Sequence, residues 1–122
     1  MKIETYKQAK RLLKSQQDFL NGPYKGRADQ IGYVNGLYNM LRSVLVDEKN
    51  GMTKQEVWDN ALFFLNGEQE HLNRLSDPKR QVRAFVEGLR IMLDVIVSEG
   101  FTEHNGLYRD KKGVWKTEKE AA

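Results

Sequence analysis

Residues 76–100, SDPKRQVRAFVEGLRIMLDVIVSEG, are the most apolar periodic stretch of the 122-residue sequence, and the predicted fold is built around them. Their apolar side chains recur at intervals of three and four, the period of one helix face: Val82, Phe85, Val86, Leu89, Met92, Leu93 and Ile96. Asp77 can cap a helix and Pro78 suits its first position, while Gly100 suits its end. We therefore expect a central helix against which other helices pack.

Three amphipathic segments precede this helix. Residues 3–20 carry an apolar stripe formed by Ile3, Tyr6, Ala9, Leu13 and Leu20, widened by Leu12 and Phe19. Asp29 can cap a second helix that ends near Asn50, and its stripe is formed by Ile31, Val34, Leu37, Tyr38, Leu41, Val44 and Leu45. Thr53 and Glu56 have the spacing of a capping box, which predicts a third helix with Val57, Trp58, Ala61, Leu62 and Leu65 inward. Residues 68–75 could add a short helical turn.

Asn-Gly pairs punctuate these segments, because both residues tolerate the left-handed backbone that closes a helix or turn. Four of the five pairs are predicted to mark boundaries: Asn21-Gly22, Asn50-Gly51, Asn66-Gly67 and Asn105-Gly106. The fifth, Asn35-Gly36, falls inside a helical pattern. Gly32 and Gly36 each cost a helix about 1 kcal/mol relative to alanine. This cost favours internal helix packing, a subunit interface or a ligand groove there, or else a helix that begins only after Gly36.

Residues 101–117 lose the helical pattern and are predicted to form a short hairpin, in which residues 107–109 and 114–116 flank Asp110-Lys111-Lys112-Gly113. Residues 118–122 are expected to be a flexible tail. The fold class is therefore mainly α: one compact domain over residues 1–122, a bundle of four to five helices with a short C-terminal β-hairpin or extended tail.

The composition excludes several functional classes. The sequence has no cysteine, so disulfides, thiolate metal sites and cysteine nucleophiles are ruled out. No run approaches the ~20 apolar residues of a membrane span, and the N-terminus lacks a signal-peptide pattern. We expect a cytoplasmic protein without a membrane partner. Glu68 and His71 form a lone Glu-x-x-His, and no phosphate loop, nucleophile elbow or zinc motif occurs. The sequence therefore predicts a non-enzymatic protein without metal or cofactor.

The distribution of charge is the feature that points to function. Residues 1–27 hold seven Lys or Arg and two acids, residues 28–108 hold eight and twelve, and residues 109–122 hold five and three. Phosphate backbones and unstacked bases favour such basic segments when aromatic residues accompany them. The predicted nucleic-acid or anion-binding residues are Lys7, Lys10, Arg11, Lys14, Lys25, Arg27, Tyr108, Arg109, Lys111, Lys112, Trp115 and Lys116. A plain solvated face is the competing interpretation for each segment.

The sequence is compatible with three hypotheses about the partner. The first is a regulator associated with nucleic acid through the basic N-terminal helix and the basic, aromatic hairpin. The second is a protein-binding adaptor or inhibitor of an acidic or nucleic-acid-handling protein, with Gly32, Gly36, Arg80, Arg83 and Arg90 as interface candidates. The third is a homo-oligomer that sequesters an anionic nucleotide between subunits. The cysteine-free layout resembles small accessory proteins of phages and mobile elements in style, without a shared motif.

Overall fold

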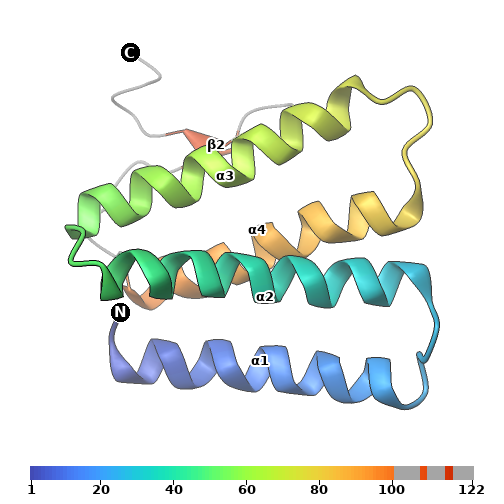
Figure 1. Cartoon of the computed structure of the whole chain (residues 1–122), viewed down its shortest axis with the longest axis horizontal. Coiled ribbons are helices and arrows are strands. Elements are labelled where there is room, and N and C mark those ends of the chain that lie inside the picture. The colour runs from blue at the N-terminus through green and yellow to red at the C-terminus, as the bar shows by residue number, and fades with distance from the viewer. Residues whose placement is uncertain (101–107, 110–114, 117–122) are drawn as a thin grey trace.

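The fold comes from a computed structural model, which describes residues 1–100, 108–109 and 115–116 (Figure 1). In these residues four helices follow one another: α1 (Ile3–Asn21), α2 (Ala28–Lys49), α3 (Lys54–Arg74) and α4 (Arg80–Gly100). The predicted helical class is confirmed. Two short strands, β1 (Tyr108–Arg109) and β2 (Trp115–Lys116), pair antiparallel, with Tyr108 opposite Lys116. The residues that would connect them lie outside the described residues, so the hairpin stays a prediction.

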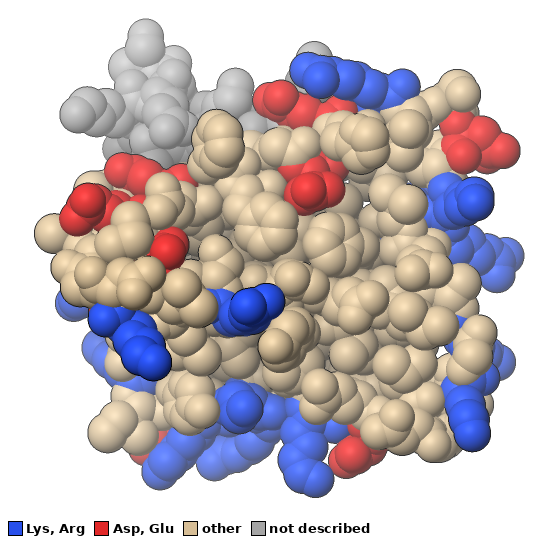
Figure 2. Space-filling model, viewed as in Figure 1, with Lys and Arg blue, Asp and Glu red and all other residues tan. Residues whose placement is uncertain are grey.

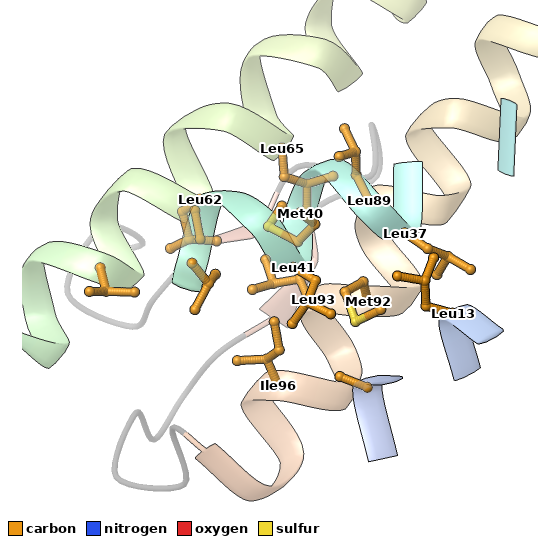
Figure 3. Close-up of a cluster of buried hydrophobic side chains, with 14 of the residues drawn as sticks. Leu13, Leu37, Met40, Leu41, Leu62, Leu65, Leu89, Met92, Leu93 and Ile96 are labelled. Carbon is orange, nitrogen blue, oxygen red and sulfur yellow. The ribbon is translucent and has the colours of Figure 1, made fainter. Parts of the chain in front are cut away.

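The pair formed by α2 and α4 is the centre of the molecule. These two helices run parallel and make the most extensive helix contact, while α1 and α3 cover opposite sides of the pair (Figure 1). The predicted central helix is thus half of a central pair. The core between the helices is made mainly of aliphatic and methionine side chains (Figure 3). Trp58 is also part of this core. Those that are completely or almost completely buried include Leu37, Met40, Leu65, Leu89, Met92, Leu93 and Ile96.

Glycines allow α2 and α4 to approach until their backbones touch. A Cβ atom added at Gly32 would lie 2.1 Å from the Gln81 carbonyl oxygen. One added at Gly36 would lie 2.1 Å from the Phe85 carbonyl oxygen, and one at Gly88 would lie 2.3 Å from that of Tyr33. Internal packing is therefore the explanation for Gly32 and Gly36. The alternative in which the helix begins after Gly36 is wrong, because α2 contains both residues.

Two of the predicted helix starts are also wrong. Asp29 does not cap α2: Arg27 holds the N-cap position, and Asp29 lies in the first turn, where its carboxylate accepts a hydrogen bond from the Gln30 amide at 3.0 Å. Pro78 is not the first residue of α4. The Val82 and Arg83 amides both donate to the Lys79 carbonyl, at 3.1 and 3.2 Å, so α4 begins after Lys79 and the connection from α3 includes Asp77 and Pro78.

The Asn-Gly boundaries hold at Asn21-Gly22 and Asn50-Gly51, where α1 and α2 end. The boundary predicted at Asn66-Gly67 is wrong, because α3 continues through it to Arg74. The helix thus includes residues 68–74 of the predicted helical turn, and Leu75 is its C-cap. The pair at residues 105–106 lies outside the described residues. The capping box that starts α3 is confirmed: the Glu56 amide donates to Thr53 Oγ1 at 3.1 Å, and the Thr53 amide donates to Glu56 Oε1 at 3.0 Å.

The inward face of α1 is narrower than predicted. Ile3, Tyr6 and Phe19, all predicted to face inward, are exposed, whereas Thr5, Ala9 and Leu13 are buried. Ile3 lies about 120° around the helix from Ala9, because each residue advances by about 100°. Gln30 of α2 secures α1 by donating its side-chain amide to the Gln16 backbone carbonyl at 2.9 Å. Because only a narrow stripe of α1 is buried, most of the surface of this helix is exposed to solvent.

Candidate functional site

The four cations at the centre of the predicted N-terminal strip share the outward face of α1. Lys7, Lys10, Arg11 and Lys14 are all exposed, and this group is called the basic face of α1 from here on. They lie together because Thr5, Ala9 and Leu13, at intervals of four, fix the opposite side of the helix against α2 and α4. Figure 2 shows Lys and Arg side chains gathered along the edge that α1 forms. Several Asp and Glu side chains lie over α3 at the other edge.

Intrahelical ion pairs occupy only part of the basic face. Lys7 Nζ lies 3.7 Å from Glu4 Oε1, and Lys14 Nζ lies 3.8 Å from Asp18 Oδ2. The two lysine side chains are 55% and 78% exposed. Exposed pairs of this kind contribute about 0–1 kcal/mol, so an incoming anion can replace the carboxylate at little cost.

An open groove runs beside the basic face. It has a volume of about 750 Å³ and is lined mostly by α1, with Val34 contributed by α2. Three cations of the basic face, Lys10, Arg11 and Lys14, line it together with Asp18. The groove is open to solvent, so its cations are accessible to a ligand that lies along the surface.

The loop between α1 and α2 extends the positive surface. Lys25 and Arg27 are exposed, and the Arg27 guanidinium carbon lies 4.9 Å from the centroid of the Tyr24 ring. Tyr24 in turn stacks on Phe19, with ring centroids 5.4 Å apart. Phe19, which was predicted to face inward, thus packs on the Tyr24 ring of this loop and is exposed.

The predicted C-terminal half of the site does not lie beside the basic face. Tyr108 and Arg109 form β1, and Trp115 and Lys116 form β2, which lies against α3 on the side of the molecule away from α1 (Figure 1). Lys111 and Lys112 lie outside the described residues. The basic face of α1 and the described strand β2 are thus separated by the central pair of helices, and a single short ligand cannot contact both.

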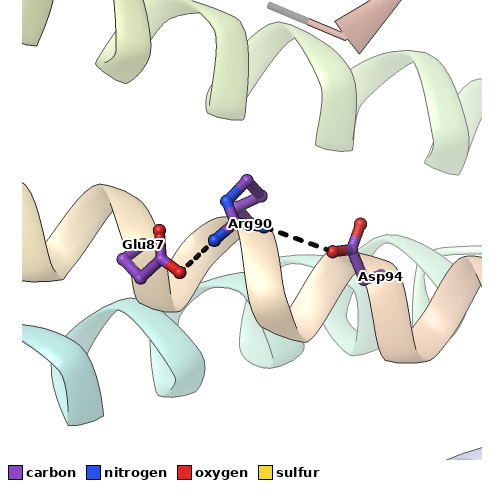
Figure 4. Close-up of polar contacts among 3 residues, drawn as sticks. All are labelled: Glu87, Arg90 and Asp94. Atoms are coloured by element: carbon purple, nitrogen blue, oxygen red, sulfur yellow. Dashed lines mark hydrogen bonds and ion pairs between the residues drawn. The ribbon is translucent and has the colours of Figure 1, made fainter. Parts of the chain in front are cut away.

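On α4, the charge of Arg90 is paired with carboxylates of the same helix. Its guanidinium lies between Glu87 and Asp94, with an ion pair to each, and Nη1 is 3.6 Å from Asp94 Oδ2 (Figure 4). The arginine side chain is only 18% exposed. Burial, with a further contribution from the Glu87 charge, raises the pKa of the nearby Tyr33, and the Arg90 charge opposes this shift. The remaining interface candidates, Arg80 and Arg83, are exposed in the first turn of α4.

A second groove was not predicted from the sequence. It lies between α1 and α2, has a volume of about 240 Å³ and is called the α1–α2 groove below. Its lining consists of Lys10, Leu13, Tyr38, Leu41, Arg42, Leu45, Val46 and Lys49. Tyr38 and Val46 are 46% and 44% exposed, and the prediction that Tyr38 faces inward is therefore wrong. The spacing of Tyr38, Arg42 and Val46, at intervals of four, was the available signal for an exposed stripe on α2.

Within the described residues, no group of three or more Asp, Glu or His side chains is placed to hold a metal ion. None of the helices in that part of the chain has an apolar stretch long enough for a membrane crossing. Comparison with known protein families, with curated proteins and with solved structures finds no match for this chain. The site must therefore be interpreted from its own geometry.

Proposed function

We propose that this protein is a non-enzymatic binding protein that holds the phosphate backbone of nucleic acid on the basic face of α1. The observation that carries the proposal is the exposed, one-sided grouping of Lys7, Lys10, Arg11 and Lys14. Nucleic acid binds such a surface because each phosphate contact releases condensed counterions. Lys25 and Arg27 extend the same surface beyond the end of α1.

Binding through this face should depend little on base sequence. Lysine contacts to phosphate position a nucleic acid without reading it, and base readout requires side chains that reach the groove edges. The groove beside the basic face is open and lined by flexible Lys and Arg side chains. We therefore assign the face a backbone-binding role, suited to a regulatory or accessory protein.

The predicted hairpin would supply a second contact. Tyr108 and Trp115 could stack on bases while Arg109, Lys111, Lys112 and Lys116 meet phosphates, the combination that single strands favour. Because β2 lies against α3, a nucleic acid would have to pass around the molecule to reach both surfaces. A short duplex, whose bases are already stacked, should therefore report on the basic face of α1, and long single strands should gain affinity by also contacting the hairpin.

The test is charge reversal on the face. We expect the combined substitutions Lys7→Glu, Lys10→Glu and Lys14→Glu to weaken binding of a short fluorescent duplex at low salt by at least roughly tenfold. Fluorescence anisotropy measures the effect, and circular dichroism confirms that the variant retains its helices. All three side chains are exposed, so the fold should tolerate the change.

A matched control distinguishes the effect of the basic face of α1 on binding from the effect of net charge. The substitutions Lys79→Glu, Arg80→Glu and Arg83→Glu change the charge equally at the start of α4, where the side chains are also exposed. This control should bind the duplex much more tightly than the α1 variant. Equal losses in the two variants would show that binding follows overall charge, and the basic face of α1 would then have no special role.

A protein-binding adaptor or inhibitor is the second candidate, and the apolar floor of the α1–α2 groove favours it. A purely phosphate-binding surface has no need of exposed Tyr38 and Val46. The substitution Tyr38→Ser separates the candidates, since it should leave affinity for the short duplex unchanged and weaken only a protein contact. A pulldown with wild type and with this variant, compared by mass spectrometry, measures the second effect.

A further inference from the structure

The most exposed large apolar side chain among the described residues is Phe63 on α3, at 83%. It points away from the core because Ala61, Leu62 and Leu65 take the inward side of the helix. Gly67 follows one turn later and has no side chain, and a Cβ built there would have no neighbour within 4 Å. An aromatic side chain this exposed can act as an anchor for another surface, because aromatic residues bury a large area in a contact.

Acidic side chains flank Phe63 on the same face. Asp59 lies one turn before it and Glu70 two turns after it, and both are exposed. With a rise of 1.5 Å per residue, they stand about 6 Å and about 10 Å from Phe63 along the axis. Glu70 has Arg74 as a distant partner at 3.9 Å, and Asp59 accepts a hydrogen bond from Gln55 at 2.8 Å. This face of α3 therefore carries an aromatic side chain with a carboxylate on either side of it along the helix.

The α1–α2 groove has the complementary features. Its floor is apolar, and its rim carries Lys10 from α1 and Arg42 and Lys49 from α2. Arg42 and Lys49 are exposed and make no ion pair with another described residue. They stand about 10 Å apart along α2. A volume of about 240 Å³ can take an aromatic side chain but falls below the ~300 Å³ at which small-ligand pockets begin.

We propose that the α1–α2 groove is the docking site for a second copy of this chain, which inserts Phe63 and places its acidic α3 face, Asp59 and Glu70, against the basic rim of Lys10, Arg42 and Lys49. A single molecule cannot make this contact with itself, because α1 and α3 cover opposite sides of the central pair (Figure 1). The contact joins two different surfaces, so each bound copy still offers one free groove and one free Phe63. Such heterologous contacts build rings or open chains.

This assembly goes beyond the proposed nucleic-acid binding and does not depend on it. One aromatic anchor with a few exposed charge pairs belongs to the weak, transient class of interfaces. Sedimentation velocity of the purified full chain, without nucleic acid, should therefore show an average mass that rises with protein concentration. High salt should reduce this association, because the charge pairs are exposed.

Two variants make the test specific. The substitution Phe63→Ser removes the anchor and leaves the groove intact, whereas Arg42→Glu with Lys49→Glu reverses the rim and leaves Phe63 intact. All three positions are exposed, so both variants should keep the helical circular dichroism of wild type. Each variant alone should associate at least roughly 30-fold more weakly than wild type, the loss that follows removal of an interface hot spot.

The mixture of the two variants is the decisive sample. The intact groove of the Phe63→Ser chain can receive the intact Phe63 of the rim variant, and each chain's other surface is blocked. We expect an equimolar mixture to form a species of two chains and nothing larger. A wild type that stays monomeric at every concentration overturns the proposal. So does a Phe63→Ser variant that associates like wild type, or a mixture that stays monomeric while wild type associates.

Discussion

At the scale of single residues, the contact between α2 and α4 depends on the absence of a side chain at Gly32, Gly36 and Gly88. A side chain at Gly36 would meet the Phe85 carbonyl oxygen at 2.1 Å and the Leu89 amide nitrogen at 2.8 Å. Both are backbone atoms of α4, so relief requires the helices to move apart and the core between them to loosen. Gly67 differs, because a Cβ there would have no neighbour within 4 Å.

These two glycines predict opposite effects of the same substitution. Gly36→Ala should lower the free energy of unfolding by at least about 2 kcal/mol, since it overpacks a backbone contact. Gly67→Ala should raise it by about 1 kcal/mol, because alanine is the better helix former and nothing obstructs it. Chemical denaturation followed by circular dichroism measures both. Equal stability of the two variants would mean that α2 and α4 do not approach as described.

Sequence reasoning identified Gly32 and Gly36 as costly residues but could not choose between an internal and an external partner. The deciding residue is Gly88, whose Cβ would lie 3.0 Å from the Gly36 Cα and 2.3 Å from the Tyr33 carbonyl oxygen. Gly88 lies within the most apolar helical segment of the chain, but it is not one of the large apolar residues that form the predicted stripe. Periodicity shows that a helix has an inward face, but it does not show which other helix that face meets.

At the scale of elements, the capping box shows how local chemistry can be read directly. Thr53 and Glu56 satisfy each other's backbone amides within three residues, so no distant part of the chain can alter the outcome. The hydrogen bonds from the Thr53 backbone and side chain lower the pKa of Glu56 below its usual value. The charged carboxylate is therefore the form that supports the start of α3.

The lowered pKa predicts a pH dependence of stability. Because the folded-state pKa of Glu56 lies below the unfolded value, its contribution is fully present above the unfolded pKa and is lost as the pH falls through the folded pKa. Glu56→Ala should therefore melt at a lower temperature than wild type at neutral pH, and the difference should shrink in acid. Melting curves for both proteins, recorded from neutral to acidic pH, provide the measurement. A difference that does not vary with pH would exclude the charged cap as its cause.

Helix boundaries that depend on tertiary packing were harder to predict. Asn66-Gly67 has the composition of a helix end, yet Leu65 and Leu72 lie on either side of it and both pack on the core. Their burial outweighs the cost of about 1 kcal/mol for one glycine inside a helix. Asp77 and Pro78 have the composition of a helix start, but the chain uses them to pass from α3 to α4. Local signals do not report how long a connection must be.

At the scale of the whole molecule, the sequence shows that the charges are segregated but not where the segments lie. The basic N-terminal segment becomes one continuous face because α1 packs on the central pair through a narrow stripe. The C-terminal basic segment could not be placed from its sequence, and β2 lies on the side away from α1. The α1–α2 groove was also missed, because a groove belongs to two helices and neither pattern contains it alone.

The basic face of α1 is the centre of the functional account, and the salt dependence of its binding tests it most directly. If Lys7, Lys10, Arg11 and Lys14 each meet one phosphate of a short duplex, the logarithm of affinity should fall against the logarithm of salt concentration with a slope of about −3.6. Replacing these four residues by glutamine should make the slope shallower by about this amount and abolish most binding. An unchanged slope in that variant, or no duplex binding by wild type at low salt, would contradict the account.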